Sequence, residues 1–169
     1  MFKLDNRLRA ILNEIEGTLI ADIGCDHGKL SVAALVEDRC QKVIAADISA
    51  NSLSKAVALA SSYHLNERIE CRVSNGFENI DESLDTAVIA GLGGYEIKDI
   101  LNTKMPTIKR LVLCPHQNVS VARKAINQLG YGAIKDFAVK DGVKYYQIIV
   151  AEKGVDEYST VMALERALH

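Results

Sequence analysis

The chain has 169 residues, 49% of them hydrophobic, which is enough apolar material for one buried core and too little length for two full domains. Its net charge of −2 excludes a protein that coats nucleic acid through overall positive charge. Residues 1–7 do not resemble a secretory signal and no apolar run reaches roughly 18 residues, so we expect a cytoplasmic protein that makes no membrane contact.

The first predicted element is a helix that Asp5 can cap and that ends at Gly17. Its apolar residues recur at helical spacing, at positions 8, 11, 12 and 15. Residues 18–23 form a short apolar run, typical of a parallel strand that is buried on both faces. The glycine-rich segment 24–28 then turns the chain into the next helix.

From residue 29 onward, predicted helices and strands alternate. They comprise helix 29–37, strand 42–47, helix 51–63, strands 69–73 and 84–90, helix 95–101, strand 110–114 and helix 119–129. Strands that are separated by helical crossovers predict a parallel sheet with helices on both of its faces.

The end of the chain departs from this alternation. Residues 133–139 and 144–151 flank an Asp141-Gly142 pair, which is typical of a hairpin turn. We therefore expect an α/β fold, Rossmann-like, with a seven-stranded, mostly parallel sheet and a C-terminal antiparallel hairpin. Residues 1–153 are expected to form one domain and residues 154–169 a short helical tail.

The chain has four cysteines, and none of them forms a C-x-x-C pair or has the spacing of zinc ligands. They are Cys25, Cys40, Cys71 and Cys114. We expect buried, reduced thiols and no metal site.

Two aspartates, Asp22 and Asp26, stand in the glycine-rich turn after the first strand. A dinucleotide site requires G-x-G-x-x-G here, and Asp26 occupies the place of the second glycine, so a pyrophosphate would meet carboxylates instead of free amides. S-adenosylmethionine carries no phosphate, and its ammonium and sulfonium are both positively charged. The turn therefore favours S-adenosylmethionine, although the two aspartates could simply cap the turn and the following helix.

Polar or glycine-rich segments also follow the next three predicted strands. Asp47 ends the second strand, where a carboxylate can accept both ribose hydroxyls or cap a helix. Asn75 and Gly76 follow the third, where the asparagine could bind the adenine amino group or form an ordinary turn. Residues 90–94, Ala-Gly-Leu-Gly-Gly, follow the fourth strand and leave room for a ligand where the strand order reverses.

Residues 4 to about 153 together resemble the bacterial tRNA (adenine(22)-N1)-methyltransferase family, which has the class I S-adenosylmethionine-dependent methyltransferase fold. The matching segments are residues 4–8, residues 21–27 with Asp-Ile-Gly-Cys-Asp-His, residues 88–94 and the strand at 144–149. The chain departs from the family by having Cys114-Pro115-His116 for Gln-Pro-Asn, Ser74-Asn75-Gly76 for Gly-Asp-Gly, and Asp47 for glutamate. It also lacks most of the family's C-terminal helical domain.

The resemblance implies methyl transfer from S-adenosylmethionine to N1 of an adenine in tRNA. It implies Asp26 as the catalytic residue, which could accept a proton from the exocyclic amine of the methylated base. The residues expected to bind the cofactor are Arg7, Asp22, Gly24, Asp26, His27, Gly28, Asp47, Ile48, Asn75, Gly76, Ala90, Gly91, Leu92 and Gly93. Those expected to bind the substrate are His116, Lys98, Arg123 and Lys124, with Lys104, Lys109 and Arg110 as further phosphate contacts.

Other interpretations stay open at this point. The basic residues could form an ordinary solvated surface, and His27 could merely pack at the start of its helix. The chain could also methylate a small molecule or a protein, or bind the cofactor without catalysing a reaction.

Overall fold

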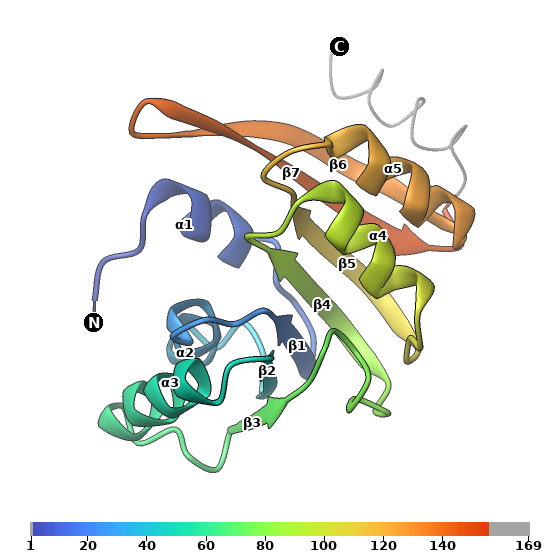
Figure 1. Ribbon diagram of the computed structural model, residues 1–169. Coiled ribbons are helices and arrows are strands. Elements are labelled where there is room, and N and C mark those ends of the chain that lie inside the picture. Colours follow the sequence, from blue (N-terminus) through green and yellow to red (C-terminus); the bar gives the residue numbers. More distant parts are fainter. Residues whose placement is uncertain (1, 156–169) are drawn as a thin grey trace.

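Seven strands form one mixed sheet in the computed structural model, which describes residues 2–155 (Figure 1). The strands are β1 Leu19–Ile23, β2 Lys42–Asp47, β3 Ile69–Val73, β4 Leu84–Ala90, β5 Ile108–Cys114, β6 Tyr131–Asp141 and β7 Lys144–Lys153. Their order is β3-β2-β1-β4-β5-β7-β6, with β1 to β5 parallel and β7 antiparallel to both of its neighbours. The predicted fold class is confirmed.

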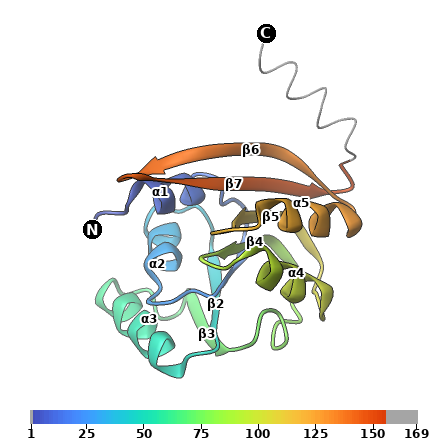
Figure 2. The same cartoon turned by 45° about the horizontal axis from the view of Figure 1, so that its top comes forward.

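Helices cover both faces of the sheet (Figures 1 and 2). They are α1 Asn6–Leu12, α2 Lys29–Val36, α3 Ala50–Ser62, α4 Gly94–Asn102 and α5 Val119–Gln128. The first three pack on one face and the last two on the other, and each group buries its own apolar cluster. Because the central strands are covered twice, their residues are apolar almost without alternation.

The first helix is shorter than the sequence predicts. Asp5 caps it as expected, by accepting the backbone N–H of Leu8 at 2.7 Å, but the helix ends at Leu12. Gly17, the predicted end, lies at the start of β1 with a φ of +117°, and a Cβ there would overlap the side chain of Asp85. The carboxylate of Asp85 accepts the backbone N–H groups of residues 18 and 19. The glycine therefore allows Asp85 to approach the backbone before β1, and it does not end a helix.

The hairpin is longer than predicted at both ends. Its strands pair from Tyr131 with Lys153 to Asp141 with Lys144, and a bulge interrupts the register near Ala133. The added residues have contacts of their own, because the Tyr131 hydroxyl donates to the Ile108 oxygen at 2.7 Å and Asn6 of α1 donates to Asp141 and to the Lys140 backbone oxygen.

No helix within residues 2–155 is long and apolar enough to span a membrane. The expected division into a domain of residues 1–153 and a tail of residues 154–169 stays a prediction, because residues 156–169 lie outside the described part of the chain.

Candidate active site

A cavity of about 870 Å³ opens at the carboxyl ends of β1 to β4. The chain builds β1, β2 and β3 outward in one direction and then returns to place β4 on the other side of β1. Loops therefore diverge between β1 and β4, which is where parallel α/β sheets bind their ligands. The volume is that of a typical small-molecule site.

Asp22 is the buried carboxylate of this cavity. It ends β1 with only 4% of its surface exposed, and the Ser31 hydroxyl donates a hydrogen bond to it at 2.7 Å. The pKa of Asp22 is raised to about 6, chiefly by burial; the Ser31 hydrogen bond opposes this rise, and the charges of Asp47 and Asp26 contribute to it. Within residues 2–155, no cationic side chain is in hydrogen-bond contact with this carboxylate.

Asp47 fixes the turn that carries Asp26. One carboxylate oxygen of Asp47 accepts the backbone N–H of Asp26 at 3.0 Å, and the other accepts that of Ser49 at 2.9 Å. Asp26 has a φ of +51°, a conformation that few residues other than glycine, asparagine and aspartate adopt. Its side chain is 77% exposed, and its Oδ1 lies 3.5 Å from Nε2 of His27. The acid predicted to be catalytic is therefore free to meet a substrate.

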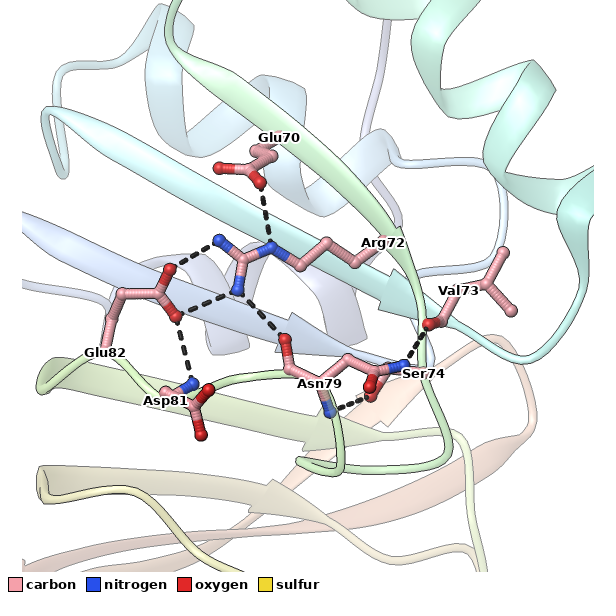
Figure 3. A network of polar contacts seen from close by, with 7 residues as sticks. All are labelled: Glu70, Arg72, Val73, Ser74, Asn79, Asp81 and Glu82. Atoms are coloured by element: carbon pink, nitrogen blue, oxygen red, sulfur yellow. Dashed lines mark hydrogen bonds and ion pairs between the residues drawn. The ribbon is translucent and has the colours of Figure 1, made fainter.

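Asn75 and Gly76 lie on a loop that is held by a network of polar contacts (Figure 3). Arg72 donates to both carboxylate oxygens of Glu82, to Glu70 and to the backbone oxygen of Asn79. The buried Ser74 hydroxyl donates to the Gly76 oxygen and accepts the Asn79 N–H. These bonds fix the loop from β3 to β4 while its tip lines the cavity.

One of the glycines after β4, Gly94, is required by a neighbouring loop. The His116 N–H donates to the Leu92 oxygen at 2.9 Å, and the Gly94 N–H donates to the Gln117 oxygen at 2.8 Å. A Cβ on Gly94 would overlap the backbone of Asn118, and one on Gly93 would touch Gln117. The first glycine of the segment, Gly91, lines the cavity with a φ of +83°, and a Cβ there would be in ordinary contact with Nε2 of His116, at 3.7 Å.

The N-terminal segment with α1, the helix α4 and the loop after β5 also line the cavity, and the hairpin supports two of these lining residues from behind. The Arg7 guanidinium lies 5.4 Å from the centre of the Tyr146 ring, and the His116 ring lies edge-on to the same tyrosine at 6.0 Å. Arg7 and His116 both line the cavity, whereas Tyr146 stands behind them. The sequence did not predict a role for Tyr146. The available signal was the Tyr145-Tyr146 pair in a strand whose other residues are mostly typical of a buried core.

Most residues that were expected to bind the cofactor line this one cavity. They are Arg7, Asp22, Gly24, Asp26, His27, Asp47, Ile48, Asn75, Gly76, Ala90, Gly91 and Leu92, and His116 joins them. Gly28 and Gly93 do not line it. Gly28 is buried against Ala56 of α3, where a Cβ would overlap, so its role is in packing.

The expected phosphate contacts are not gathered at the cavity. Lys109 and Arg110 lie near the amino end of β5, at the end of the sheet opposite to the cavity. Lys109 pairs there with Asp85 at 3.2 Å, and Arg110 pairs with Glu152 at 2.9 Å. Arg110 is the most enclosed of the group, with 13% of its side chain exposed. The strand therefore places these two residues away from the cavity, and their expected contact with phosphates stays a prediction.

The other basic residues are also separated from the site. Lys104 pairs with Asp81, and Arg123 forms two hydrogen bonds with Asp136, at 2.5 and 2.9 Å. Arg123 and Lys124 line a second hollow between α5 and the end of β7, while Lys98 lines neither cavity. Of the four residues expected to bind substrate, only His116 lies at the first cavity.

The residues of the first cavity fit S-adenosylmethionine. The buried Asp22 and the more exposed Asp26 and Asp47 favour a positively charged ligand, and phosphates would be repelled. Gly24 has no atom within 4 Å of the position of a Cβ, so a ligand can approach its backbone. Ile48 is 75% exposed beside Asp47 and offers an apolar surface for a flat ring.

Comparison with known proteins agrees with this geometry. Residues 4–149 match a family model described as a methyltransferase domain. The tRNA (adenine(22)-N(1))-methyltransferase of Bacillus subtilis is 31% identical over 157 residues, which are 90% of this chain and 66% of that enzyme. The crystal structure of B. subtilis M1A22 tRNA methyltransferase TrmK superposes with a TM-score of 0.86 at 30% identity, covering 91% of this chain and 68% of that one.

A second related structure contains a cofactor product. M. capricolum TrmK in complex with S-adenosyl-homocysteine superposes with a TM-score of 0.84 at 25% identity, over 95% of this chain and 75% of that chain. The present chain therefore spans about two thirds to three quarters of the length of these relatives.

Proposed function

As a member of the tRNA (adenine(22)-N1)-methyltransferase family, the chain is an S-adenosylmethionine-dependent methyltransferase, and we propose that it methylates N1 of an adenine in tRNA, in the cytoplasm. The observation that carries the proposal is the acidic cavity at the reversal of strand order, in which Asp22 is buried without a cation. The relatives named above are tRNA methyltransferases, and this supports the choice of substrate.

The cofactor-binding residues have separate tasks in this proposal. When bound, S-adenosylmethionine supplies an electrophilic methyl group on a positively charged sulfur. Asp22 and its neighbours balance that charge, Asp47 can accept the ribose hydroxyls, and Asn75 can accept the adenine amino group through its amide oxygen. The Asp47 carboxylate is already oriented by two backbone N–H groups, so it needs no reorganisation to bind.

Asp26 acts on the acceptor base. The N1 lone pair of adenine lies in the plane of the ring and is free at neutral pH, so no base is needed to expose it. Methylation places a positive charge on the adenine, and a carboxylate beside it can stabilise that charge or accept a proton from the exocyclic amine. Several exposed acids line the cavity, and we assign this role to Asp26 because it stands in the turn after β1 and its backbone N–H is held by Asp47. In a folded tRNA the target base would have to be extruded to reach it.

The proposal is tested in two measurements. Titration calorimetry with S-adenosylmethionine measures cofactor binding, and transfer of a labelled methyl group to bulk tRNA, followed by nucleoside analysis, identifies the product. We expect tight cofactor binding and 1-methyladenine. Cofactor binding without any methylated tRNA would refute the proposed substrate and would point to a small molecule, to a protein or to a homologue that does not catalyse.

A further inference from the structure

The tip of the β6–β7 hairpin carries an exposed tyrosine between lysines. Tyr145 is 70% exposed and Val143 is 92% exposed, and Lys140 and Lys144 are exposed as well. The Lys140 ammonium lies 5.8 Å from the centre of the Tyr145 ring. Since Lys140 and Tyr145 are directly paired across the two strands, their side chains stand on the same face of the hairpin.

This face is opposite to the one that packs on the protein. The neighbouring pair, Val139 and Tyr146, contacts the apolar cluster that includes α1, so alternation along the strands turns Lys140 and Tyr145 outward. The tip is also pinned: the Asn6 side chain donates to the Lys140 backbone oxygen at 3.1 Å, and the Asn6 N–H donates to Asp141 at 3.4 Å. An exposed aromatic ring is thus presented on a fixed support.

The tip stands on the same edge of the molecule as the active site. Leu113, next to the carboxyl end of β5, pairs with Ile149, so residues 144–147 of β7 continue past that end (Figure 2). Tyr146, beside Tyr145, contacts both Arg7 and His116 at the wall of the cavity. A strand of RNA that places one base in the cavity would therefore pass close to the tip.

The charge of the cavity makes such a contact necessary. Asp22, Asp26 and Asp47 repel phosphates, so the backbone on either side of an extruded nucleotide has to be held by cations outside the cavity. Exposed lysines supply charge for phosphates, and an exposed tyrosine supplies a surface on which an unpaired base can stack.

We propose that the hairpin tip binds the RNA strand next to the acceptor nucleotide, through Lys140 and Tyr145 on its outer face and through the exposed Lys144 beside the turn. Tyr145 stacks on a neighbouring unpaired base, and the two lysines contact phosphates. This inference rests on the proposed function, because it takes tRNA as the ligand.

The test compares tip variants with wild type in tRNA binding and methylation at several salt concentrations. Tyr145→Ala should weaken tRNA binding about tenfold, because stacking of one base on an aromatic ring is lost, and Tyr145→Phe should restore it. Lys140→Gln and Lys144→Gln should each reduce the slope of log affinity against log salt by about 1. Calorimetry with S-adenosylmethionine and the melting temperature should stay as in wild type, because these side chains neither line the cavity nor belong to the core.

Lys42→Gln is the matched control. Lys42 is an exposed lysine at the amino end of β2, at the end of the sheet opposite to the active site. Its loss should therefore leave tRNA affinity and the salt slope unchanged. Tip variants that bind and methylate tRNA as well as wild type would overturn this inference alone. If wild type itself neither binds nor methylates tRNA, the proposed function fails and the inference fails with it.

Discussion

Asp22→Asn should stabilise the protein without cofactor and at the same time weaken cofactor binding. Burial raises the pKa of Asp22 to about 6 from its ordinary 3.8, so above pH 6 the folded chain holds an ionised carboxylate in a buried place. This difference in pKa corresponds to a destabilisation of the folded state by about 3 kcal/mol at neutral pH. An asparagine is neutral and can still accept the Ser31 hydrogen bond.

As pH falls, the contribution of Asp22 to the stability of the fold and its contribution to cofactor affinity change in opposite directions. Because the pKa of this acid is raised in the fold, wild type gains stability from Asp22 as pH falls from about 6 toward 3.8, and the advantage of Asp22→Asn disappears over that range. Binding of a positively charged cofactor requires the ionised form, so the affinity of wild type for S-adenosylmethionine should fall below pH 6. The affinity of the variant should change much less over the same range.

The expected effects are large enough to measure. At pH 8 we expect Asp22→Asn to raise the melting temperature by about 6 °C, for a net gain of about 2 kcal/mol, and to bind S-adenosylmethionine about 30-fold more weakly. Thermal unfolding from pH 4 to 8 and calorimetry at the same pH values provide both quantities.

Asp85→Asn provides a matched comparison. Asp85 lies at the amino end of the sheet, and the Leu19 and Thr18 backbone N–H groups lower its pKa, so its substitution should destabilise the fold and leave cofactor binding unchanged. If Asp22→Asn is less stable than wild type at pH 8, or if its cofactor affinity is unchanged, then the buried charge of Asp22 is not held for the cofactor.

Three further substitutions test other parts of the site. Asp26→Asn, which keeps a residue that tolerates positive φ, should lower kcat at least 100-fold while cofactor affinity in calorimetry stays within about threefold. Arg72→Met should weaken cofactor binding several-fold, because the loop that carries Asn75 loses its polar support, and it should increase backbone amide exchange in that loop. Gly94→Ala should reduce the free energy of unfolding by more than 2 kcal/mol, since the added Cβ overlaps the backbone of Asn118, and a urea titration would show no loss if the two loops can separate.

The fold was predictable because its periodic signals are strong. Short apolar runs that alternate with helical patterns predict a doubly covered parallel sheet, and the Asp-Gly pair marks the hairpin. The end of α1 was predicted wrongly because the apolar Ile15 continues the helical spacing. In the structure Ile15 belongs to a turn that follows the helix, and its side chain is buried there. Local spacing does not distinguish these two ways of burying a side chain.

The ligand-binding part of the site was more predictable than the substrate-binding part. Asp22 and Asp47 lie in the last two positions of their strands and Asn75 lies two residues after its strand. Parallel strands bring their carboxyl ends to one end of the sheet, so sequence position fixes the place of these residues. Arg110 and Lys109 also belong to a strand but stand near its beginning, and charge alone does not indicate at which end a residue lies. Tyr146 and Ser31 act by supporting other side chains, and such contacts depend on packing between elements that are distant in sequence.

The place of β7 has a consequence for how the chain folds during synthesis. Strand β7 lies between β5 and β6 and forms hydrogen bonds with both. Within the described sheet, β6 therefore has no complete partner strand until the chain has been made to about residue 153. Until then β5 presents an open edge to solvent and to other nascent chains. A ribosome that pauses between β6 and β7 would therefore hold an aggregation-prone intermediate, and the sheet can close only when the final strand emerges.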